Sequence, residues 1–136
     1  MLSLGEVLTG LKGCTTDKER VEFLQNVGPR YVSTLRAVLK CVFDPSVKFA
    51  LPEGAPPYKK KDDEPGALFH AVKKLHILTE GGYPGLSQMR RESLFTGLLE
   101  SLTDEDAVLV LAMKDKKFPY PGVNRKVALK AFPDLF

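Results

Sequence analysis

The clearest chemical feature of the sequence is a group of basic residues in its last quarter. The segment from Lys114 to Lys130 contains six lysines and arginines and one acidic residue, Asp115, which gives it a local net charge of +5. A glycine turn runs directly into a predicted helix start at residues 122–125. Free backbone N–H groups and the positive end of the helix dipole favour an anion at such a start.

The pattern therefore predicts a phosphate-binding surface in this segment. A solvated basic face without any ligand is the alternative that the pattern leaves open. The candidate residues are Lys114, Lys116, Lys117, Gly122, Asn124, Arg125, Lys126 and Lys130.

The other polar clusters indicate no catalytic or metal site. The acidic run at residues 104–106 is explained by helix capping, and the run at residues 62–64 falls in a loop. His70 and His76 are six residues apart and do not share a helix face. Nucleotide-binding loops, nucleophile elbows and zinc-ligand spacings are missing from the sequence. We expect a protein that is not an enzyme, with no cofactor, no metal and no small-molecule substrate.

Composition is typical of one globular domain. The 136 residues are 43% hydrophobic with a net charge of +3, enough apolar material for one core over residues 1–136. The longest apolar run falls far short of the roughly 20 residues that a membrane span needs. The N-terminal residues do not resemble a signal peptide, so we expect Cys14 and Cys41 to be free, buried thiols in a reducing cytoplasm.

Helix signals recur along the chain with clear boundaries. Thr16 and Glu19 form a capping box, and the nearly continuous apolar run from Ala107 to Met113 predicts a central, buried helix. Sustained two-residue alternation is absent, so the fold is predicted to be all-α. About seven helices are predicted, beginning near Ser3, Thr16, Pro29, Ala67, Ser87, Thr103 and Asn124.

A different composition marks residues 51–66. This stretch holds four prolines, two glycines and an unbroken charged run from Lys59 to Glu64. Such a sequence predicts a solvated loop, which we expect to be the most mobile segment. It separates two helical halves of one domain, because neither half alone buries a sufficient core.

A resemblance rests on residues 94–99, the acidic helix start at 103–107, and the turn and helix over 122–136. With looser similarity in the first half, the whole length resembles the N-terminal helical DNA-binding domain of ATP-dependent DNA ligases, most closely that of T-even-type bacteriophages. The resemblance implies that Lys116, Lys117, Gly122, Asn124, Arg125 and Lys126 lie along a duplex backbone. The chain departs from that pattern at residues 118–121 and at Asp134, where the ligases have glycine, and no Lys-x-Asp-Gly motif is present.

Residues 51–58, 91–101 and 131–135 also resemble a family of short proteins of T-even-like phages. Together the two resemblances imply a phage accessory protein that binds duplex DNA without sequence specificity, in the cytoplasm of an infected bacterium or in the virion. The alternative is an adaptor for a phage or host protein, or a minor virion component, that kept the fold without DNA binding. Acidic residues near the basic segment favour that alternative.

Overall fold

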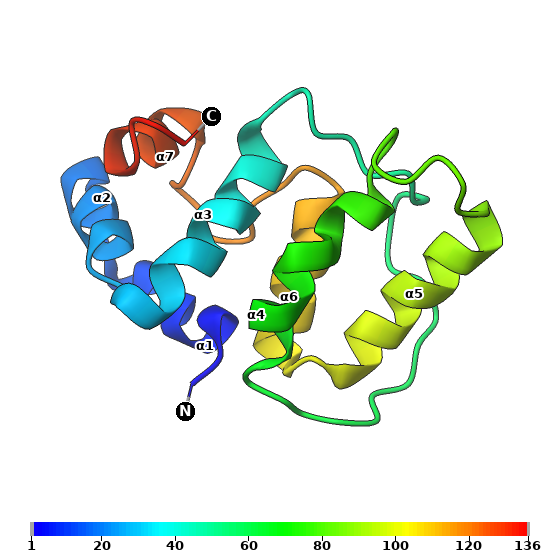
Figure 1. Cartoon of the computed structure of the whole chain (residues 1–136). Coiled ribbons are helices and arrows are strands. Elements are labelled where there is room, and N and C mark those ends of the chain that lie inside the picture. Colours follow the sequence, from blue (N-terminus) through cyan, green and yellow to red (C-terminus); the bar gives the residue numbers. More distant parts are fainter. Residues whose placement is uncertain (1, 136) are drawn as a thin grey trace.

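Helices account for all the regular secondary structure in the part of the chain that the computed structural model describes, residues 2–135 (Figure 1). A single isolated bridge, between Phe49 and Thr79, is the nearest approach to a strand pair there, so the predicted all-α class is confirmed. The α-helices are α1 (Leu4–Leu8), α2 (Asp17–Gln25), α3 (Pro29–Phe43), α4 (Ala67–Ala71), α5 (Gln88–Ser101), α6 (Asp104–Lys114) and α7 (Arg125–Ala131). Two 3-10 helices, η1 (Thr9–Gly13) and η2 (Val72–Leu78), continue α1 and α4.

Local capping sets the start of five helices. The side chains of Ser3, Thr16, Ser87, Thr103 and Asn124 each accept a hydrogen bond from the backbone N–H three residues later. These bonds satisfy N–H groups that have no partner within the helix. All five residues were predicted as helix starts from their type and spacing, and the structure confirms them.

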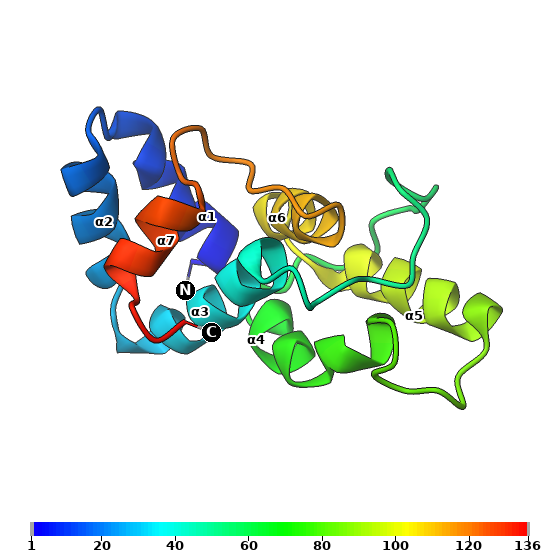
Figure 2. The same cartoon turned by 90° about the horizontal axis from the view of Figure 1, so that it is seen from above.

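Helix α6 lies at the centre of the core, as its apolar run predicts. It packs against α1 and α3 and buries Leu109, Val110 and Met113 completely, but Val108 within the same apolar run is 55% exposed. Helices α2 and α7 pair beyond α3, whereas α4, η2 and α5 lie on the opposite side of the molecule (Figure 2). One cluster of buried side chains draws on both halves of the sequence, so the described chain forms a single domain.

The helix that was predicted to begin near Ala67 changes from α to 3-10 geometry after Ala71. The end of this helix forms backbone hydrogen bonds with residues 48–50. Ala50 N donates to Leu78 O at 2.9 Å, and Glu80 N donates to Lys48 O at 2.7 Å. Thr79 also donates its backbone N–H and its hydroxyl to His76 O. These tertiary contacts favour the tighter i, i+3 bonding that often ends helices.

The expectation for the two cysteines needs correction. Cys14 and Cys41 are free thiols as predicted, but both are only partly buried. Among the apolar residues of α5, Met89 is 83% exposed. No helix among residues 2–135 has the length and hydropathy to cross a membrane.

The proline-rich segment before α4 has no helix or strand, as predicted, but it is attached to α5. Lys61 N and Asp62 N both donate to Glu100 O at 3.0 Å, and Glu64 N donates to Ser101 O at 3.1 Å. These carbonyls belong to the last turn of α5, where helix carbonyls lack partners. The loop therefore caps α5, and its greater mobility stays a prediction.

Candidate functional site

Lys114 does not belong to an exposed basic surface. Its side chain is almost fully buried at the end of α6. The ammonium donates to Pro52 O at 2.8 Å and to the carboxylate of Asp115 at 2.6 Å. Both partners satisfy the charge inside the protein, so Lys114 joins α6 to the proline-rich loop.

Lys116 is also used internally. Its Nζ donates to the carbonyl oxygens of Cys41, Asp44 and Val47, the last two at 2.8 and 2.7 Å. These carbonyls lie at or just beyond the C-terminal end of α3, which is the negative end of its dipole. Burial lowers the pKa of Lys116. Its backbone has a φ of 60°, a left-handed conformation that is uncommon for a lysine.

The other basic candidates are on the surface. Helix α7 buries Val127, Ala128 and Ala131, and its three cations are exposed. Lys117, in the preceding loop, is exposed as well. The exposed basic candidates are thus Lys117, Arg125, Lys126 and Lys130.

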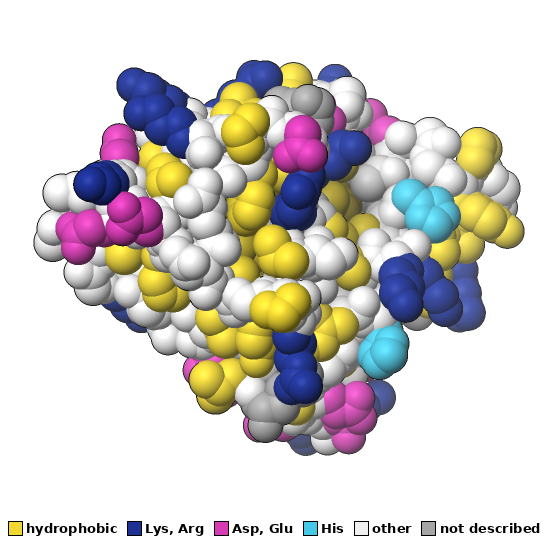
Figure 3. Space-filling model, turned by 60° about the vertical axis from the view of Figure 1, so that its left-hand side comes forward, with side chains coloured by type: hydrophobic (Ala, Val, Ile, Leu, Met, Phe, Trp, Pro, Cys, Tyr) yellow, Lys and Arg dark blue, Asp and Glu magenta, His cyan; other side chains and the backbone are white. Residues whose placement is uncertain are grey.

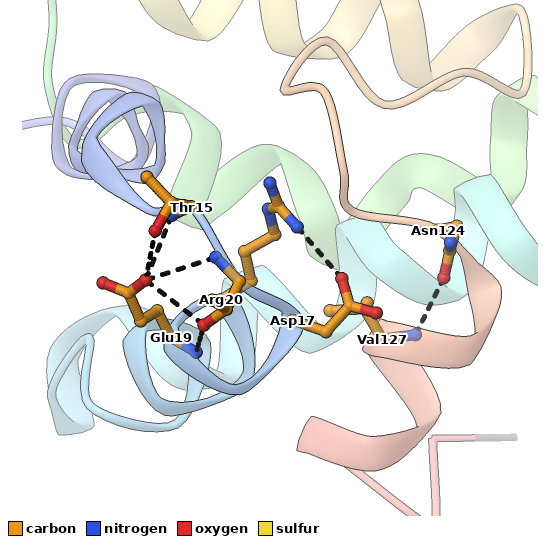
Figure 4. Close-up of polar contacts among 7 residues, drawn as sticks. Thr15, Asp17, Glu19, Arg20, Asn124 and Val127 are labelled. Atoms are coloured by element: carbon orange, nitrogen blue, oxygen red, sulfur yellow. Dashed lines mark hydrogen bonds and ion pairs between the residues drawn. The ribbon is translucent and has the colours of Figure 1, made fainter.

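Asn124 and Gly122 shape the turn before α7. Asn124 Oδ1 accepts from Val127 N at 2.9 Å, so the side-chain oxygen is occupied by capping (Figure 4). Gly122 has a φ of 91°, and a Cβ there would lie 2.4 Å from the guanidinium carbon of Arg20. Glycine is favoured here because L-residues avoid this φ, and a Cβ would also displace the guanidinium end of Arg20.

Arg20 lies beside the turn at Gly122 and was not identified from the sequence as part of the candidate site. It comes from α2 and is held by Asp17, with an Nη1 to Oδ1 distance of 2.9 Å (Figure 4). Its Nε atom is buried without a hydrogen-bond partner in the described structure. The i, i+3 spacing of Asp17 and Arg20 signals an ion pair on one helix face, but no local pattern links that pair to Gly122.

Charges of both signs surround α7. Lys130 borders a surface hollow that is also lined by Asp17, Lys18 and Glu22 of α2. Figure 3 shows the basic side chains of this side of the molecule in separate groups, with hydrophobic and acidic side chains between them. The exposed cations of this side therefore do not form one unbroken basic strip.

The acidic helix start has a structural explanation. Asp106 is fully buried, and its Oδ1 accepts from Gly5 N at 2.6 Å, which links α6 to α1. Burial raises the pKa of Asp106 to about 6. Asp104 pairs with Lys60 of the loop at 3.0 Å. Within residues 2–135, no group of three potential metal ligands is assembled.

Comparison with known proteins gives a family but no activity. No curated protein and no solved structure matches the chain. The resemblance to DNA ligase domains thus stays a prediction. A family model described as a family of unknown function (DUF6433) matches residues 7–119, which include Lys114, Lys116 and Lys117 and end before α7. Because the match covers most of the 136 residues, the chain belongs to the DUF6433 family of unknown function.

Proposed function

We propose that this protein is a non-catalytic module that binds the phosphate backbone of duplex DNA without sequence specificity. The observation that carries the proposal is the orientation of α7. Its apolar side packs within the protein while Arg125, Lys126 and Lys130 are exposed. With the resemblance to phage proteins, this suggests an accessory protein acting in an infected bacterial cell.

The geometry of α7 suits contacts to phosphate. Lys126 and Lys130 are four residues apart, so they lie on one helix face about 6 Å apart along the axis. Neither they nor Lys117 form an ion pair within the described structure. Their ammonium groups are therefore available to replace the counterions of a duplex. Phosphate contacts position a protein on DNA but do not read its bases.

A salt titration tests this proposal. The wild-type protein is titrated with two unrelated duplexes of roughly 20 base pairs, or two helical turns, at several salt concentrations. Lys117, Lys126 and Lys130 allow a log–log slope of up to about −2.7, at roughly 0.9 per phosphate neutralised. Both duplexes should bind with similar affinity.

Variants assign the contacts. Lys126→Ala with Lys130→Ala should make the slope about 1.8 less steep for both sequences. Lys73→Ala is the control, since Lys73 is an exposed lysine of η2, remote from α7. A wild-type protein that fails to bind at low salt, or a double variant with the wild-type slope, would refute the proposal.

The adaptor alternative gains from two observations. Lys114 and Lys116 turn inward, and Asp17 and Glu22 lie beside Lys130, so the site has fewer free cations than the sequence suggests. Failure of the wild-type protein to bind duplex DNA at low salt would favour this alternative, with a phage or host protein as the partner.

A further inference from the structure

An apolar groove lies between η2 and α5. These two elements are on the side of the molecule away from α7 (Figure 2). The volume of the groove is about 170 Å³. Lys74 is the only charged residue among those that line it, which are Ala71, Lys74, Leu75, Ile77, Leu78, Leu94 and Leu98. The groove is thus an apolar feature on a surface that is otherwise rich in charge.

The walls of the groove are fixed. Arg91 of α5 is buried and donates from Nε to Ile77 O of η2 at 3.2 Å and from Nη2 to Leu86 O at 3.3 Å. Leu94 is 38% exposed, and the space over Gly97 is open, since a Cβ there would meet nothing within 4 Å. A groove held by such bonds is formed before any partner arrives, which lowers the cost of binding.

The charged side chain that lines the groove is positive. Lys74 lines it, and the exposed Arg90 lies one helical turn before Leu94 on α5. Carboxylates of α5 are directed elsewhere: Glu92 lines a different pocket beside Phe95, and Glu100 pairs with Lys61. Figure 3 shows basic side chains gathered between the two histidines, which belong to α4 and η2, and an acidic side chain beside the lower one. This charge pattern is complementary to an acidic partner.

We propose that the groove binds an acidic amphipathic helix of another protein. A cavity of about 150 Å³ accommodates benzene, so this groove takes one or two branched apolar side chains. Two leucines four residues apart on one face of the partner helix would contact Leu94 and Leu98, which are also four residues apart on α5. Carboxylates flanking them would meet Lys74 and Arg90. This inference does not depend on DNA binding by α7.

A synthetic peptide tests the docking site. The probe is a helical peptide of about 15 residues with two leucines at i and i+4 and glutamates on both flanks. A second peptide has lysine in place of every glutamate. Binding is measured by fluorescence anisotropy, and the site is located from amide chemical shifts of Ala71, Gly97 and Leu98. The glutamate peptide should bind and shift these amides, and the lysine peptide should not.

Matched variants separate the apolar and charged contributions. Leu94→Ser and Lys74→Glu should each weaken peptide binding by about tenfold, or 1.4 kcal/mol. Met89→Ser is the control, because Met89 is an exposed apolar residue of the same helix that does not line the groove. Circular dichroism confirms that each variant folds. Lys126→Ala with Lys130→Ala should leave peptide binding unchanged, so failure of the DNA proposal would not affect this one.

Three results would overturn the inference. The first is that the glutamate peptide shifts none of the three amides at millimolar concentration. The second is equal binding of the two peptides, which would exclude charge complementarity. The third is wild-type affinity in folded Leu94→Ser protein, which would place the peptide elsewhere.

Discussion

Replacing Lys116 with methionine separates the structural lysine of the basic segment from its surface lysines. Methionine keeps the length and apolar stem of the side chain and removes the ammonium. Three carbonyl oxygens, of Cys41, Asp44 and Val47, then lose their shared donor. The end of α3 loses both its hydrogen bonds and a favourable charge at the negative end of the dipole.

The size of the effect follows from these contacts. A hydrogen bond to a charged group contributes about 1.5–3 kcal/mol, but water can reach part of this site because Lys116 is only partly buried. Removing the ammonium also removes the cost of its partial desolvation. We therefore expect a loss of about 2–4 kcal/mol in the free energy of unfolding. For a domain of this size that is a decrease in Tm of roughly 6–15 °C.

The assay is urea denaturation of Lys116→Met beside Lys117→Met. Lys117 is adjacent and exposed, so its substitution should change stability by less than about 0.5 kcal/mol. In DNA titrations of the folded proteins, Lys117→Met should have the larger effect. It should reduce the salt slope by about 0.9, whereas Lys116→Met should leave the slope unchanged. Equal stability of the two variants would refute the capping role of Lys116.

Two more predictions concern the contact between α1 and α6. Because burial raises the pKa of Asp106 to about 6, above its value in the unfolded chain, the folded state binds the extra proton and stability increases as the pH falls from 7 to 5. Asp106→Asn should abolish that increase in urea titrations at the two pH values, and an unchanged pH dependence would exclude Asp106 as its source. Gly5→Ala would place a Cβ 2.5 Å from the Glu105 carbonyl carbon, so it should cost about 1–3 kcal/mol by overpacking. Gly13→Ala, with no atom within 4 Å, is the control for helix propensity, and equal thermal stability of the two alanine variants would contradict the close approach.

The helix boundaries could be predicted because the signals are local. A capping side chain bonds a backbone N–H only three residues away, so Thr16 and Ser87 carry their information in the adjacent sequence. The limits of α3 follow in the same way from Gly28-Pro29 and Asp44-Pro45. The 3-10 geometry of η2 could not be predicted, because it depends on pairing with residues 48–50, far away in the sequence.

The candidate site was harder to predict for a related reason. A sequence shows that cations are clustered, but the direction of a lysine side chain depends on acceptors supplied by the fold. Lys114 reaches Pro52 and Lys116 reaches Cys41, 62 and 75 residues away in sequence. Arg20 lies beside Gly122 across a still larger separation in sequence, so no local pattern reveals the contact. The lysines of α7 were easier, because helical periodicity alone places them opposite Val127 and Ala131.

The pairing of α2 with α7 has a consequence for the order of folding during synthesis. The capping box lets α2 form its first turn from local sequence, but the helix it packs against begins at Arg125, 100 residues after Gln25. Gln25 then donates to Ala131 O at 3.1 Å to join the two helices. Contacts between such distant segments carry a loop-closure cost and slow folding. While the ribosome makes the intervening chain, α2 has an uncovered apolar side, and its burial waits until residues 125–131 have emerged.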